Sequence, residues 1–120
     1  MARVVKFRGK SKFTGEWHYG HYHFGVMYPN SIANHYIDNE IIDVNTLGQL
    51  IGFNDGGLPV YEGDVSSFKY LIFYNESKCL FAEHFKQRFT GEYALAAYPI
   101  DLHRIKIIGN IHDNPELLAW

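Results

Sequence analysis

The sequence is poor in cysteine and proline, with one cysteine and four prolines in 120 residues, and it has no long apolar run. A lone cysteine, Cys79, cannot form a disulfide within the chain, which favours a reducing compartment. A membrane-spanning helix needs roughly 18 consecutive apolar residues, and the first eight residues are too polar for a secretory signal. We therefore expect a cytoplasmic protein without membrane contact, and we interpret Cys79 as a buried thiol in a strand.

Motifs that commonly carry catalysis are missing as well. The sequence contains no Gly-rich phosphate loop, no serine nucleophile elbow, no Cys-x-x-Cys pair and no His-Glu-x-x-His motif. Glu62 and Asp64 would share one face of a regular strand, but two acids near a turn are more often held by backbone amides or solvent than used for acid–base chemistry. The sequence therefore favours a protein that is not an enzyme and needs no cofactor.

Charge is nearly balanced overall but uneven along the chain. A net charge of −2 excludes a protein that coats nucleic acid through an overall basic field. Five cations nevertheless precede the first carboxylate, Glu16: Arg3, Lys6, Arg8, Lys10 and Lys12. One interpretation is a solvated edge strand that its charges keep from aggregating. The alternative is that these cations, together with Trp17, contact the phosphates of a nucleic acid or an acidic partner.

Aromatic residues make up 17% of the chain, and apolar runs are cut about every ten residues by clusters of Gly, Asn, Asp and Pro. This pattern is typical of short strands. It predicts strands over residues 17–26, 36–37, 40–44, 47–53 and 105–108, a strand that begins at Pro59 and bulges at Gly63, and a hairpin of 68–74 with 80–85. It also predicts turns at 28–31 and 54–57, a strand or loop over 86–98, and a short helix from Pro115.

Histidines form the one cluster that suggests a metal. His21 and His23 would project from one face of a regular strand, where they could bind zinc or copper with His18 or His35 as a third ligand. No carboxylate at a fixed spacing completes the set. An aromatic packing surface is therefore the simpler interpretation.

Three segments carry a family resemblance: residues 48–53 (GQLIGF), 59–65 (PVYEGDV) and 106–118 (KIIGNIHDNPELL). In this order, and preceded by residues 6–11 and 14–20, they resemble the YopX family of small proteins encoded by phages and prophages. In that family the first segment usually carries a Tyr-Thr pair where this chain has Leu50 and Ile51, and a lysine-rich turn where it has 54–57. The resemblance implies kinship and a phage setting, without an assigned biochemical activity.

The resulting prediction is an all-β protein that forms a single unit over residues 1–120. A strand region over residues 1–45 packs against a small barrel-like or sandwich part over 46–120, and a short C-terminal helix closes one end. We expect a binding or assembly module of a phage or prophage that forms homo-oligomers, since many aromatics would otherwise be exposed. The alternatives are nucleic-acid binding through the basic segment, and inhibition or regulation of a host protein.

Overall fold

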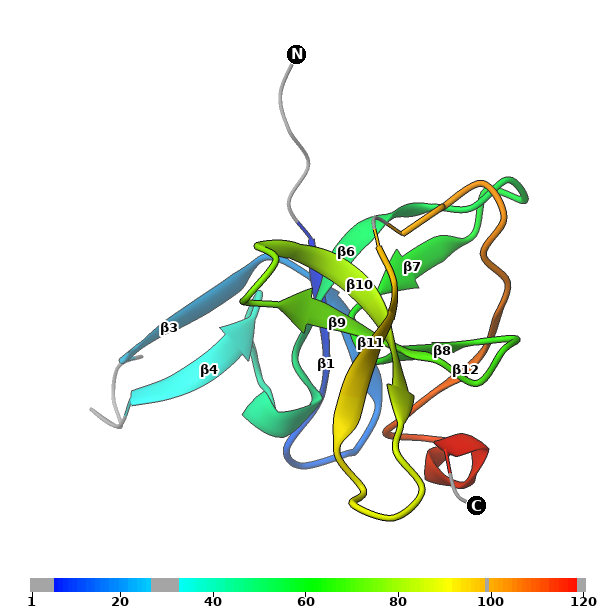
Figure 1. Cartoon of the computed structure of the whole chain (residues 1–120). Helices are drawn as coiled ribbons and strands as arrows, with labels where there is room; N and C mark the ends of the chain where they lie inside the picture. Colours follow the sequence, from blue (N-terminus) through cyan, green and yellow to red (C-terminus); the bar gives the residue numbers. More distant parts are fainter. Residues whose placement is uncertain (1–5, 27–32, 99, 119–120) are drawn as a thin grey trace. The chain divides into compact units, whose positions relative to one another are not determined.

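The computed structural model of the chain describes residues 6–26, 33–98 and 100–118 (Figure 1). Regular structure in these residues consists of short antiparallel strands and two 3-10 turns, which confirms the all-β class. The chain divides into two compact units, Met1–Leu50 and Ile51–Trp120. No helix in the described part is long and apolar enough to cross a membrane. Arg3 and the turn predicted at 28–31 lie outside the described residues.

The basic segment forms an inner strand of the first unit. Strand β1 (Phe7–Lys10) pairs antiparallel with β2 (Trp17–Gly20) on one side and with the start of β6 (Gly48–Phe53) on the other. The interpretation of this segment as an edge strand is therefore wrong. It failed because β6, the second partner, comes from a distant part of the sequence.

A second sheet of the first unit has the order β3 (Tyr22–Val26), β4 (Ala33–Ile37) and β5 (Glu40–Ile41). The strand predicted over 17–26 is thus two strands in different sheets, with a break between Gly20 and Tyr22. A Cβ atom at Gly20 would lie 2.6 Å from Oδ2 of the exposed Asp38 side chain, so a larger residue at this break would require the carboxylate to move. The strand predicted over 40–44 ends at Ile41 and is followed by the 3-10 turn η1 (Val44–Thr46).

The buried apolar side chains of the first unit come from the second sheet and the residue after it. Tyr36, Ile37 and Ile42 are all buried. Gly9 on β1 allows this packing, because a Cβ atom there would collide with Ile42 and would also touch Ile37. The close approach places the Gly9 face of β1 against the core and leaves Arg8 and Lys10 on the opposite face of the strand.

The second unit is built on one antiparallel sheet with the strand order β11-β10-β9-β8-β12. Its strands are β8 (Asp64–Ser66), β9 (Leu71–Asn75), β10 (Leu80–Lys86), β11 (Tyr93–Ala97) and β12 (Ile107–Asn110), preceded by β7 (Pro59–Tyr61). The β9–β10 hairpin and the strand start at Pro59 confirm the predictions. The segment 86–98, predicted as strand or loop, contains β11.

Three local predictions in the second unit need correction. Cys79 is exposed in the turn of the hairpin with a φ of 55°, and its thiol donates to the Glu76 carbonyl at 3.4 Å. Gly63 occupies a tight turn between β7 and β8 with a φ of 90°, rather than a bulge within a strand. The predicted C-terminal helix is only a 3-10 turn, η2 (Pro115–Leu118), because so short a segment closes too few α-helical hydrogen bonds.

Six buried apolar residues of the second unit form two clusters. Val60, Ile72 and Ile105 make the first, and Val65, Leu71 and Leu118 make the second. Ile72 and Leu71 are neighbours in β9 and belong to different clusters, as expected for side chains that alternate between the two faces of a strand. Strand β9 therefore contributes to packing on both faces of the sheet.

Candidate functional site

Two of the predicted cations lie over the ring of Trp17. Lys10 is directly opposite Trp17 in the β1–β2 register, and its Nζ atom is 5.3 Å from the ring centroid. Cζ of Arg8 is 4.8 Å from the same centroid, and Arg8 is buried. Each such cation–π contact contributes about 0.5–1 kcal/mol at exposed sites and about 2 kcal/mol when desolvated. The cluster stabilises the β1–β2 pair.

The other predicted contact residues are dispersed. Lys6 is exposed ahead of β1, and Lys12 is exposed in the turn after it, where its N–H donates to the Ile41 carbonyl at 2.9 Å. The structure therefore brings together Arg8, Lys10 and Trp17. Nucleic-acid contact by these residues stays a prediction.

The histidine cluster is engaged in aromatic contacts. His23 stacks on Tyr36 with ring centroids 5.0 Å apart, and Nδ1 of His35 is 2.7 Å from the Tyr22 hydroxyl. His21 lies between β2 and β3, so the predicted regular strand that would align it with His23 is interrupted. No group of three or more His, Cys, Asp or Glu in the described ranges could hold a metal ion.

Strand β3 presents an uncharged edge. It is the outer strand of its sheet in the described structure, and its sequence, YHFGV, contains no Lys, Arg, Asp or Glu. Phe24 and Val26 on this strand are 60% and 59% exposed. Edge strands normally carry charges, prolines or bulges that prevent pairing with another chain. Strand β3 carries none of these within its bounds.

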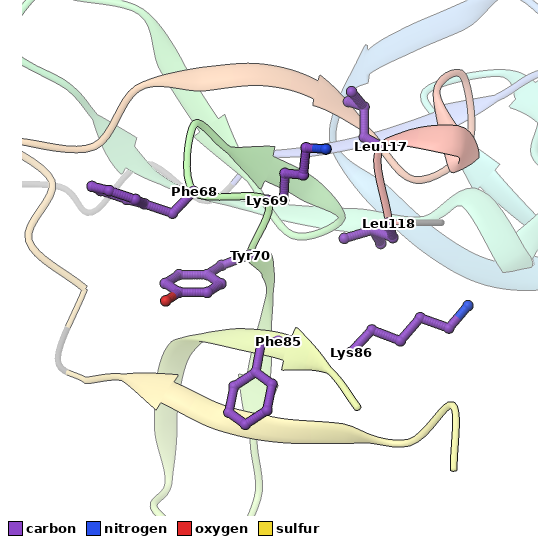
Figure 2. A pocket seen from close by; sticks show the side chains of 7 residues that line it. All are labelled: Phe68, Lys69, Tyr70, Phe85, Lys86, Leu117 and Leu118. Atoms are coloured by element: carbon purple, nitrogen blue, oxygen red, sulfur yellow. The ribbon is translucent and has the colours of Figure 1, made fainter. Parts of the chain in front are cut away.

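An apolar cavity of about 140 Å³ opens on the second unit (Figure 2). Its walls are Phe68 and Tyr70 from the segment before β9, Phe85 from β10, and Leu117 and Leu118 from η2. Lys69 and Lys86 complete the lining. Sequence reasoning missed this site, although an aromatic residue is followed by a lysine at both 68–69 and 85–86, at the two ends of the predicted hairpin.

A comparison with protein families identifies the kinship of the chain. The family model described as YopX protein matches residues 6–119, nearly the whole length. The chain belongs to the YopX family. A search of curated proteins found no match.

The closing YopX segment has a structural role. The Asn110 side-chain oxygen accepts from the N–H groups of His112 and Asp113 at 3.0 and 2.9 Å, and Asn114 Oδ1 accepts from the Asn110 N–H at 3.3 Å. A Cβ atom at Gly109 would lie 2.5 Å from Asn114 Oδ1 and 2.8 Å from Leu117 Cδ1. The segment thus holds η2, and with it one wall of the cavity, against the sheet.

The two acids of the family segment 59–65, Glu62 and Asp64, hydrogen-bond to backbone amides, as the sequence favoured. Oδ2 of buried Asp64 accepts from the Tyr61 N–H at 2.8 Å, and Oε2 of Glu62 accepts from the Tyr74 N–H at 3.4 Å. An unpaired buried amide would cost about 1–3 kcal/mol. Asp64 therefore stabilises the turn at Gly63.

A buried histidine, His84, gives an expectation for how the stability of the chain depends on pH. His84 on β10 stacks on Phe73 with centroids 3.6 Å apart, and its Nε2 lies 3.2 Å from the Asn75 amide nitrogen. Burial lowers the pKa of His84 below its usual 6.5, while backbone groups of Leu71 and Ala82 act in the opposite direction. The unfolded chain therefore binds a proton that the folded chain excludes as pH falls through 6.5.

We expect the free energy of unfolding to decrease as pH falls from 6.5 to 5, and His84→Gln to flatten this dependence. Denaturant titrations at several pH values measure it. His103→Gln is the control, because the carboxylate of Asp55, 2.8 Å away, raises the pKa of exposed His103. The stability that His103 gains from Asp55 is fully present below pH 6.5 and is lost only above that pH. Equal slopes for wild type and His84→Gln between pH 5 and 6.5 would contradict the assignment.

Proposed function

We propose that this YopX protein is a non-enzymatic assembly module in which strand β3 of one copy pairs with β3 of a second. It acts without a cofactor in the cytoplasm of a bacterium that carries the phage or prophage, the setting that the family resemblance implies. The observation that carries the proposal is the uncharged edge of β3 with exposed Phe24 and Val26. Adding a strand to such an edge satisfies its backbone groups and covers apolar side chains.

The sequence of β3 suits pairing with itself. In an antiparallel pair with a two-fold axis at Phe24, the two Phe24 rings face each other and Tyr22 of one copy lies opposite Val26 of the other. Aromatic–aromatic and aromatic–β-branched pairs stabilise antiparallel strands by about 0.2–1 kcal/mol each. His23 lies opposite Gly25, where no atom would lie within 4 Å of an added Cβ. The pairing therefore opposes no like charges at neutral pH and has room for the imidazole.

Strand β11 is a rival edge, since it is also an outer strand and its sequence, YALAA, is uncharged. Its larger side chains, Tyr93 and Leu95, are half-buried. It therefore offers less apolar surface for a second copy to cover than β3 does, and we place the interface on β3.

Replacing Phe24 by lysine is expected to raise the dimer dissociation constant at least about tenfold, or about 1.4 kcal/mol. The substitution removes the Phe–Phe pair and opposes two ammonium groups across the axis. Sedimentation velocity over a wide concentration range, in reducing buffer, measures the constant. Phe89→Lys is the matched control, because Phe89 is 96% exposed in the second unit. Ala96→Lys tests the β11 edge.

The controls separate the possible results. Loss of association in Phe24→Lys alone supports the β3 interface, whereas loss in Ala96→Lys alone assigns the interface to β11 and overturns the proposal. A wild-type protein that sediments as a monomer at every accessible concentration also overturns it.

Two other roles that the sequence predicts stay predictions: nucleic-acid contact through the basic segment, and binding to a host or phage protein. Sedimentation with duplex DNA at low and high salt distinguishes the first, because binding through phosphate contacts weakens steeply with salt.

A further inference from the structure

We infer that the cavity of the second unit binds an acidic segment of a partner protein by enclosing one aromatic side chain. The site is separate from β3, and all seven residues that line it belong to the second unit. The inference depends on three properties of the cavity: its size, the chemistry of its walls and the charge at its rim.

The volume of the cavity suits a single aromatic ring. The cavity has a volume of about 140 Å³ and is partly open to solvent, and a closed apolar cavity of about 150 Å³ in another protein binds benzene. The walls that would contact the ring are Phe68, Tyr70, Phe85 and two leucines (Figure 2). Phe68 is 77% exposed, so a ring that enters the cavity would cover an aromatic surface that otherwise faces solvent. Aromatic side chains of this kind commonly anchor protein interfaces.

The positive charge of the cavity lining favours acidic residues on either side of the inserted aromatic residue. Lys69 and Lys86 are the charged residues of the lining, which contains no carboxylate. Glu116 is the nearest acid in sequence to Leu117 and is exposed, without lining the cavity. Carboxylates on either side of an inserted ring would complement the two ammonium groups, which gives specificity and faster association more than affinity.

The backbone conformation of Lys69 supports its role at the rim of the cavity. Its φ is 63°, a left-handed conformation that is uncommon for a residue other than glycine. Its N–H donates to the Ser66 carbonyl at 2.8 Å, which closes the turn and fixes Phe68 and Lys69 beside the cavity. A glycine would adopt this φ without strain, so the lysine is held here at a conformational cost.

A protein segment fits this cavity better than a nucleotide. The polar edge of a base needs hydrogen-bonding partners when it is buried. Besides the two lysines, the side chains of the lining offer only the hydroxyl of Tyr70. A phenyl ring needs no such partner.

Fluorescence polarisation with a labelled pentapeptide tests the site. The probe carries one phenylalanine with two aspartates on each side, and two matched peptides replace the phenylalanine by serine or the aspartates by lysines. We expect saturable binding of the first peptide alone. The double variant Lys69→Gly and Lys86→Gln should weaken it about tenfold, and Phe68→Ser about 3- to 10-fold. Lys69→Gly keeps the turn, and Lys78→Gln, in the hairpin turn of the same unit, is the matched control.

Three results would overturn the inference: no saturation up to about 1 mM peptide, equal binding of the three peptides, or binding that the cavity variants leave unchanged. Binding of a DNA oligonucleotide but not of the peptide would reassign the site to nucleic acid and also overturn it. The Phe24→Lys variant is expected to bind the peptide like wild type. Peptide binding and self-association can therefore fail independently.

Discussion

Replacement of Ile72 by alanine is expected to lower the free energy of unfolding by about 2–5 kcal/mol. Ile72 is fully buried and belongs to the cluster with Val60 and Ile105. Its removal loses the transfer free energy of the deleted methyl and methylene groups and leaves a cavity between strands that cannot close around it. Because its carbonyl also accepts the Gly63 N–H at 2.7 Å, the collapse of β9 needed to fill the cavity would disturb the β7–β8 turn.

Denaturant unfolding followed by circular dichroism measures this effect, with Ile108→Ala as the matched control. Ile108 is a strand residue of the same unit and is 42% exposed, so the same deletion should cost less than about 1 kcal/mol. Similar losses in the two variants would contradict the assignment of Ile72 to the core.

Replacement of Gly9 by alanine is expected to destabilise the first unit by about 1–3 kcal/mol, the cost of overpacking a closed core. The added methyl group would meet Cγ2 of Ile42 and touch Cδ1 of Ile37, both buried. Ile42 is branched at Cβ and has few alternative rotamers, so it cannot turn away cheaply. Strand β1 would have to separate from the second sheet to accommodate the methyl group.

Gly25→Ala is the control for Gly9→Ala at protein concentrations where the chain is monomeric, because Gly25 lies in a strand of the same unit and no atom of its own chain is within 4 Å of an added Cβ. Alanine there should leave stability unchanged or raise it by about 0.5–1 kcal/mol through the lost freedom of the unfolded chain. Thermal unfolding of both variants measures the difference. A Gly9→Ala protein as stable as Gly25→Ala would show that Ile42 does not pack on Gly9.

Local sequence signals predicted the fold where the interactions are local. Apolar runs on either side of residues 75–78 predicted the β9–β10 hairpin, because its partners are neighbours along the chain. The inner position of β1 could not be predicted this way, since it depends on pairing of Arg8 with Gly48 and of Phe7 with Gln49, far along the sequence. Periodicity likewise cannot show that Gly20 faces the Asp38 carboxylate and ends a strand.

The candidate site could be predicted from the sequence only in part, for the same reason. The basic segment was visible as a charge run, but the burial of Arg8 over Trp17 follows from strand register. The cavity combines Phe68 and Phe85 with Leu117 from the closing YopX segment, and only the folded chain brings these together. The pairs of aromatic residue and lysine are visible in the sequence, whereas their shared cavity is not.

The exposed thiol of Cys79 allows the chain to be labelled at a single position. As the sole cysteine of the chain, and exposed in a turn of the second unit, it accepts one maleimide probe per molecule without competition from another thiol. A fluorophore or spin label attached there would leave both candidate binding surfaces uncovered, because Cys79 belongs neither to the lining of the cavity nor to β3. Peptide binding at the cavity and association through β3 can therefore each be measured on labelled protein without the label occupying either surface.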